Sequence, residues 1–103
     1  MTRNEFAERQ RIDLTRQIDE HRQEEGRLSV RVQEIDAEID KSDARIATGI
    51  AGVKAGEATT LRLLKRDKAA AEAKVAERVQ IREGDEALLA QVDQFLEHTS
   101  KGK

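Results

Sequence analysis

A histidine and two glutamates lie at helical spacing in the first half of the chain, which is a spacing that metal sites use. His21 precedes Glu24 and Glu25 by three and four residues, so a helix places the three side chains on one side. A di-metal site in a helical bundle needs carboxylates from several helices and two Glu-x-x-His units, and Ile18 stands three residues before His21 instead. We therefore expect no metal ion and no other cofactor.

Nucleophilic chemistry is not indicated either. The only serines are Ser29, Ser42 and Ser100, and no histidine is spaced to activate one of them. Cysteine is absent, which excludes disulfides and thiolate nucleophiles. The glycines of the chain lack the Gly-Lys-Ser/Thr ending of a phosphate-binding loop. The sequence predicts a protein that is not an enzyme.

Several charged residues stand at positions that a pair of helices would turn toward each other. If the chain folds back near residue 52, Glu25 lies between Arg78 and Arg82, and His21 lies beside Asp85. Such a polar layer costs hydrophobic burial and chiefly fixes the register of the helices and the choice of partner. We interpret this layer as a register-setting device rather than a reactive site.

Two long helices are needed to position these residues. Apolar residues recur in alternating steps of three and four, which is the seven-residue repeat of a coiled coil, and no proline interrupts it. The repeat comprises Leu14, Ile18, Leu28, Val32, Ile35, Ile39 and Ile46 in the first half, and Leu61, Leu64, Ala71, Val75, Leu89, Val92 and Leu96 in the second. The sequence predicts an all-α fold, an antiparallel two-helix coiled-coil hairpin, with dimerisation into a four-helix bundle as its extension.

Three glycines within eight residues, Gly49, Gly52 and Gly56, are the predicted turn, because each costs roughly 1 kcal/mol of helix preference relative to alanine. We expect one domain over 1–103, with helix one at about 4–48, the turn at about 49–58, helix two at about 59–98 and a frayed tail at 99–103. Folding at this turn pairs residues whose numbers add up to about 105. The alternative is a helix that continues through the glycines, giving a structural rod of two parallel long helices.

Threonines stand where each of the two helices is expected to begin. Thr2, with Glu5 three residues later, has the pattern of a capping box, and Asn4 is the other candidate cap for helix one. Thr59 or Thr60 is the expected cap of helix two.

The composition is that of a long-helix protein with little to hold a small molecule. Charged residues make up 39% and aromatic residues 2% of 103 residues, with no Trp or Tyr to stack on bases or sugars. The first ten residues contain no apolar stretch of a signal peptide, and no window approaches the ~18 apolar residues of a membrane span. We expect a cytoplasmic protein without membrane contact.

The formal charge of −2 is unevenly distributed. The stretch from Lys41 to Lys74 carries eight basic and four acidic residues, so it is net positive and the remainder is net negative. The predicted anion-binding face near the turn comprises Arg45, Lys54, Arg62, Lys65 and Arg66. Phosphate contacts of this kind would make nucleic-acid binding strongly salt-dependent. Glu57 and Asp67 interrupt this face in the sequence.

Apolar residues outside the main repeat favour a protein partner. Ile81, Leu88 and Phe95 repeat at seven and lie beside Val92, so the last third of helix two has an apolar face wider than one neighbour covers. We expect Phe6 and Ile12 to cover part of this patch and the rest to be an interaction surface. The predicted function is a non-catalytic interaction module, an adaptor, inhibitor or assembly protein that forms a homodimer and binds another protein. A nucleic-acid accessory protein is the alternative.

Overall fold

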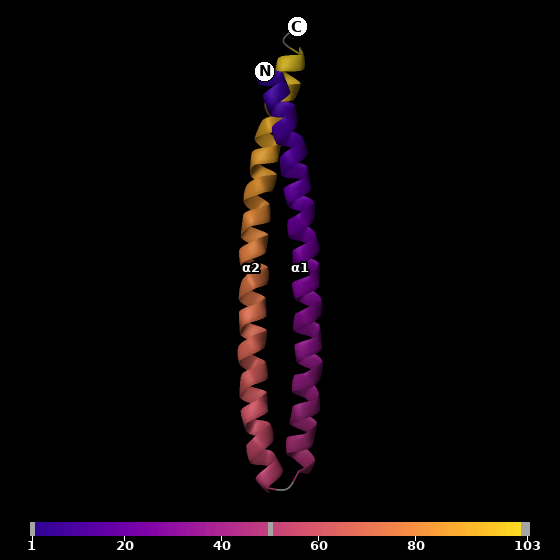
Figure 1. Ribbon diagram of the computed structural model, residues 1–103, viewed down its shortest axis with the longest axis vertical. Coiled ribbons are helices and arrows are strands. Elements are labelled where there is room, and N and C mark those ends of the chain that lie inside the picture. Colours follow the sequence, from indigo (N-terminus) through magenta and orange to yellow (C-terminus); the bar gives the residue numbers. More distant parts are fainter. Residues whose placement is uncertain (1, 50, 102–103) are drawn as a thin grey trace. The chain divides into compact units, whose positions relative to one another are not determined.

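The computed structural model describes residues 2–49 and 51–101, with side chains described for 2–49 and 54–99. Helix α1 spans Arg3–Thr48 and helix α2 spans Ala51–Lys101 (Figure 1). No described residue belongs to a strand. The two helices pack against each other in opposite directions, which confirms the predicted all-α hairpin. The alternative rod, with one helix continuing through the glycines, is wrong for this structure, because α1 ends at Thr48.

Packing divides the chain into two compact units, and both helices contribute to each. The terminal unit comprises Met1–Glu25 and Glu77–Lys103, and the turn unit comprises Gly26–Ala76. Over the residues that the structure describes, neither helix has a stretch long and apolar enough to cross a bilayer.

In the terminal unit, the predicted repeat supplies the buried contacts. Leu14 and Ile18 are buried on α1, and Ala7 continues the same row toward the start of the helix. The hydroxyl oxygen of Thr2 accepts a hydrogen bond from the Glu5 backbone N–H at 3.1 Å. Thr2 is therefore the N-cap, as its spacing to Glu5 predicts, because its oxygen satisfies a backbone donor that has no partner within the helix.

The C-terminal end of α2 is longer than the sequence predicts. The helix continues to Lys101, and the Thr99 hydroxyl donates to the Phe95 carbonyl oxygen at 2.6 Å, one turn back. The frayed tail predicted from residue 99 is therefore wrong for 99–101, and 102–103 lie outside the described residues.

In the turn unit, each helix contributes a buried residue of the predicted repeat. Ile35 is buried to 1% exposure, and Ala71 is the buried residue on the partner helix. The ion pair of Asp36 with Lys68, at 2.7 Å, fixes the predicted register, since their residue numbers add up to nearly 105. Hydrogen bonding to Asp36 is the main reason that the pKa of Lys68 is raised.

The turn itself is much shorter than the predicted 49–58. Helix α2 begins at Ala51, so Gly52 and Gly56 lie within it, whereas Gly49 lies outside both helices and Ile50 is outside the described residues. Thr59 and Thr60 are also helical rather than capping, because their hydroxyls donate to the carbonyl oxygens of Ala55 and Gly56 at 3.4 and 3.3 Å.

A polar contact across the turn unit accounts for the early start of α2. The fully buried Ser42 hydroxyl donates to Glu57 Oε2 at 2.8 Å, and Arg45 forms an ion pair with Glu57, with Nε 2.8 Å from Oε1. Glu57 is thereby held against α1 in the second turn of α2. We attribute the helical conformation around Gly56 to this tertiary contact, which outweighs the weak helix preference of glycine.

Candidate functional site

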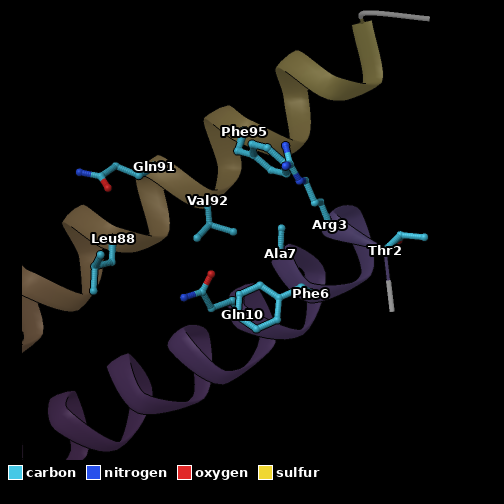
Figure 2. A pocket seen from close by; sticks show the side chains of 9 residues that line it. All are labelled: Thr2, Arg3, Phe6, Ala7, Gln10, Leu88, Gln91, Val92 and Phe95. Carbon is cyan, nitrogen blue, oxygen red and sulfur yellow. The ribbon is translucent and has the colours of Figure 1, made fainter.

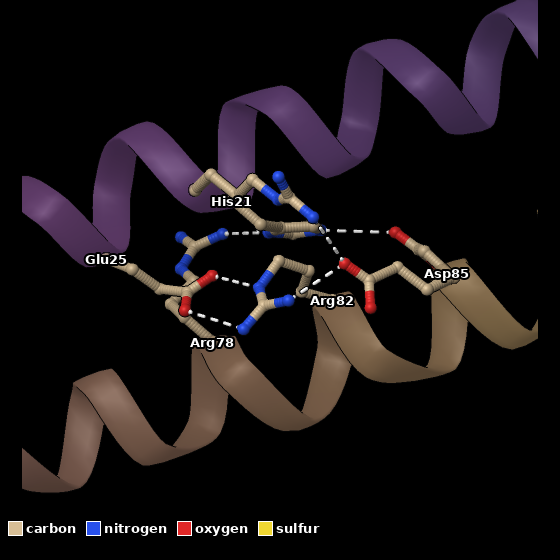
Figure 3. A network of polar contacts seen from close by, with 7 residues as sticks. His21, Glu25, Arg78, Arg82 and Asp85 are labelled. Atoms are coloured by element: carbon tan, nitrogen blue, oxygen red, sulfur yellow. Dashed lines mark hydrogen bonds and ion pairs between the residues drawn. The ribbon is translucent and has the colours of Figure 1, made fainter.

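The predicted polar layer is assembled within the terminal unit, where α1 and α2 contribute facing side chains (Figure 3). Its centre is the pair of Arg82 and Glu25. Arg82 Nε lies 2.6 Å from Glu25 Oε2 and Nη2 lies 3.2 Å from Oε1, a two-point contact between a planar guanidinium and a carboxylate. Hydrogen bonding to Glu25 is the main reason that the pKa of Arg82 is raised.

Two further residues that the sequence analysis missed extend this layer. Arg82 Nη1 donates to Glu86 Oε1 at 2.8 Å, and Arg22 Nη2 donates to the same oxygen at 3.1 Å. The polar cluster is defined here as these residues together with the predicted ones: His21, Arg22, Glu25, Arg78, Arg82, Asp85 and Glu86. The four-residue spacing of Arg82 and Glu86 is the sequence feature that could have identified Glu86.

His21 is held from both sides by α2. Arg78 Nη1 lies 3.2 Å from Nδ1 of His21, and Asp85 Oδ2 lies 3.3 Å from Nε2. Because a guanidinium can only donate, Nδ1 accepts from Arg78, and the neutral imidazole then carries its proton on Nε2, on the side of Asp85. The predicted contact of His21 with Asp85 is present, but Arg78 pairs with His21 rather than with Glu25. Both ring nitrogens are thereby engaged within the hairpin.

The cluster is suited to fixing register rather than to reacting. Its contacts join specific atoms across the helices, so a slip of one helix along the other would separate Glu25 from Arg82 and His21 from Asp85 at once. Within the part of the chain that the structure describes, no group of three His, Cys, Asp or Glu side chains is placed to hold a metal ion.

Acid should weaken the polar cluster at Glu86. Hydrogen bonds from Arg82, and then from Arg22, lower the pKa of Glu86. A carboxylate with a depressed pKa stabilises the folded state above its unfolded value, about 4.3, and loses that contribution as the pH falls through the folded value. We expect the difference in Tm between the wild type and Glu86→Gln to shrink from about pH 4 downward. A difference that stays constant from pH 7 to pH 2 would contradict this assignment.

Removing one partner of the central ion pair should lower the Tm more than removing both partners. Arg82→Leu leaves the mostly buried Glu25 carboxylate without its two-point partner, whereas Glu25→Leu with Arg82→Leu leaves an apolar layer. We expect the single variant to melt below the wild type and the double variant to regain most of the loss, as measured by circular dichroism. The control is Arg16→Leu, which breaks an exposed pair with Asp13 at 3.6 Å and should change Tm little. A double variant no more stable than Arg82→Leu would contradict this expectation.

An apolar groove lies in the same unit, nearer the chain ends (Figure 2). Its volume is about 560 Å³, and both helices contribute to its walls. The terminal groove is lined by Thr2, Arg3, Phe6, Ala7 and Gln10 of α1 and by Leu88, Gln91, Val92 and Phe95 of α2. In Figure 2, Ala7 and Val92 point into the space between the helices, while Phe6 and Phe95 come from opposite sides.

The terminal groove holds both of the aromatic residues in the chain. Phe6 and Phe95 are the only two, and their exposed fractions are 58% and 42%. Leu88 is 48% exposed beside them. Fully burying one such side chain from water is worth about 1.5–3 kcal/mol, so leaving three of them about half exposed forgoes part of that stabilisation, which a bound surface would recover.

The structure places the predicted apolar patch partly in this groove. Leu88, Val92 and Phe95 line it, and Ile81 is exposed on α2 without lining it. Phe6 joins the groove as expected. The expected cover by Ile12 is wrong, because Ile12 is largely exposed and does not line the groove.

The predicted anion-binding face belongs to the turn unit. Arg45 forms an ion pair with Glu57, so the prediction that it belongs to the anion-binding face is wrong. Lys54, Arg62, Lys65 and Arg66 are exposed on α2, and among the described residues they form no ion pair. Glu57 does not interrupt this face, because its carboxylate is turned toward Ser42 and Arg45.

Comparison of this chain with protein-family models, with curated proteins and with solved structures finds no match in any of the three.

Proposed function

We propose that this chain is a non-catalytic, cytoplasmic interaction module, an adaptor, inhibitor or assembly protein that self-associates and binds protein through its terminal groove. The single observation that carries the proposal is the placement of both phenylalanines, half exposed, around one apolar groove. Aromatic residues are enriched at protein interfaces and dominate their energetics. A chain with only two aromatic residues that places both at one groove is suited to binding there.

The exposed area also supports association. The chain exposes 7599 Å², whereas a compact monomer of 11.6 kDa exposes about 5,800 Å². The excess of about 1,800 Å² exceeds the ~800 Å² that each partner buries in a stable complex of standard size. A second copy is the simplest partner, since a two-fold dimer buries the same patch twice.

The polar cluster supports this function by positioning the groove. A slip of one heptad between α1 and α2 would move Phe6 by about 10 Å relative to Phe95, at 1.5 Å per residue, and would separate the two walls. Such a slip would also break the contact of Glu25 with Arg82. In this proposal the polar cluster is a specificity device for the groove beside it.

Sedimentation velocity of the wild type at low and high salt tests the proposal. We expect a dimer that persists between about 0.05 and 0.5 M salt, because screening weakens charge contacts and leaves apolar burial intact. A monomer throughout, at concentrations up to hundreds of micromolar, would refute self-association.

The exposed cations of the turn unit favour nucleic-acid binding as a second candidate function. Lys54, Arg62, Lys65 and Arg66 lie within about one third of the circumference of α2, at 100° per residue. Because Glu57 faces α1, no carboxylate stands on this arc between Lys54 and Arg66. No aromatic residue lies there to stack on a base, so binding would be to the phosphate backbone and independent of base sequence.

A fluorescence-anisotropy titration with a labelled DNA duplex distinguishes this candidate. Backbone binding through three or four cations predicts a steep loss of affinity with salt and a further loss in Arg62→Gln with Lys65→Gln and Arg66→Gln. The matched control is Arg9→Gln with Arg11→Gln and Arg16→Gln, which removes the same charge from the terminal unit. Equal losses of DNA affinity in the two triple variants would refute binding through the cations of the turn unit.

A further inference from the structure

Helix α2 carries a second seven-residue repeat, on a different face from the one that packs against α1. Ile81, Gly84, Leu88, Gln91 and Phe95 follow one another in steps of three and four. The row that α2 turns toward α1 is separate and contains Arg82, Asp85, Leu89, Val92 and Leu96, which are less exposed. A helix with two such rows is suited to packing against two neighbours, and the hairpin provides only one.

Gly84 is the unexplained member of this second row. It lies far from both ends of α2, so it does not serve as a helix cap. No glycine among the described residues has a positive φ, so no unusual backbone conformation requires it. A Cβ placed on Gly84 would meet no atom within 4 Å, so close packing within the chain does not require it either. Glycine is the poorest helix former after proline. A neighbour that approaches α2 closely would account for its presence between Ile81 and Leu88.

We infer that α2 packs in antiparallel orientation against α2 of a second copy, with Leu88 at the two-fold axis and Gly84 facing Gln91 of that copy. This inference rests on the proposed function and specifies its partner and geometry. With Leu88 on the axis, Ile81 faces Phe95 of the second copy. The long Gln91 side chain then enters the space that a Cβ at Gly84 would occupy.

Charge and volume both favour this orientation over a parallel one. The second row extends to Glu77 at one end and His98 at the other, and both are exposed. Antiparallel packing brings Glu77 near His98 of the second copy, whereas parallel packing brings Glu77 against Glu77. Parallel packing would also place Gly84 opposite Gly84, which leaves a void, and Phe95 opposite Phe95.

Disulfide trapping with single cysteines tests the geometry directly, because the natural chain has no cysteine. A disulfide requires Cα atoms within about 7 Å. We expect Leu88→Cys to cross-link to itself, and Ile81→Cys to cross-link to an isotope-labelled Phe95→Cys chain in a mixture. Ile81→Cys alone and Phe95→Cys alone should form disulfide-linked dimers at least about tenfold more slowly. In either variant the cysteines of the two copies would lie two heptads, about 21 Å, apart. Rapid self-linking of Ile81→Cys and of Phe95→Cys would overturn the antiparallel orientation.

The role of Gly84 is tested with a matched glycine. Gly84→Ala should raise the Tm of the dilute monomer through its helix preference while weakening dimerisation about tenfold or more, because a methyl group would crowd the contact. Gly26→Ala is the control, since a Cβ at this helical, exposed glycine also meets open space and the residue lies outside the second row. It should raise Tm similarly and leave the dimer Kd unchanged. Equal Kd values for the two variants would overturn close approach at Gly84.

The failures of this inference and of the proposed function are distinguishable. A wild-type dimer that gives the parallel cross-linking pattern, or that tolerates Gly84→Ala, overturns the inferred geometry and leaves self-association standing. A wild type that is monomeric by sedimentation, with no variant cross-linking faster than random collision, overturns both.

Discussion

Leu88→Glu combined with Phe95→Glu should convert the proposed dimer into a monomer of 11.6 kDa. Both side chains are about half exposed in the terminal groove, so the hairpin itself tolerates the change. Association would bury four carboxylates per dimer in an apolar contact, and each costs several kcal/mol unless it is paired. We expect the dimer Kd to rise by at least about a thousandfold. Sedimentation equilibrium of the double variant, with circular dichroism to confirm its helicity, provides the measurement.

The chain offers a control with the same added charge. Val30 and Leu63 are exposed apolar residues of the turn unit and do not line the terminal groove. Val30→Glu with Leu63→Glu should leave the proposed dimer intact at moderate salt. If the groove variant keeps the mass of the wild type, or if both double variants dissociate equally, the groove is not the contact.

Ile35→Ala should be the most destabilising single truncation in the hairpin. Ile35 is 1% exposed and belongs to the turn unit. Truncating a buried isoleucine costs about 2–5 kcal/mol, through lost burial and the cavity that remains. Two helices have few other layers to compensate, so we expect urea unfolding to show a lower midpoint with an unchanged slope.

Val30→Ala is the matched truncation, since Val30 is half exposed on the same helix. Its free energy of unfolding should stay within about 0.5 kcal/mol of the wild type. An Ile35→Ala variant that unfolds at the wild-type midpoint would show that this layer is not packed in solution as it is here.

The fold could be predicted from the sequence because its determinants are periodic. Buried Leu14, Ile18 and Ile35 all belong to the predicted seven-residue repeat, and the Asp36–Lys68 contact follows from the predicted register. The polar layer was predictable for the same reason, since Glu25 and Arg82 stand in rows that otherwise hold apolar residues. Positions spaced alternately by three and four residues lie on one face of a helix, whether their side chains are apolar or polar.

The local details depended on contacts that spacing does not specify. Gly52 and Gly56 suggested a long turn, but the contact of Glu57 with Ser42 and Arg45 accompanies a helix that starts at Ala51. Arg78 contacts His21 and not Glu25. The helix register places Arg78 near both residues, and the side-chain rotamers decide between them. Ile12 was expected to cover the apolar patch because it is apolar, but its place on the helix circumference turns it away.

Fluorine NMR of the chain labelled with fluorophenylalanine tests most directly the claim that protein covers the terminal groove in solution. The label reports on Phe6 and Phe95 alone, and both line the groove. On raising the concentration from low to high micromolar, both resonances should shift together and lose their sensitivity to exchanging H2O for D2O, as water leaves the two rings. Two resonances that keep the same shift and the same solvent sensitivity at every concentration would contradict the claim.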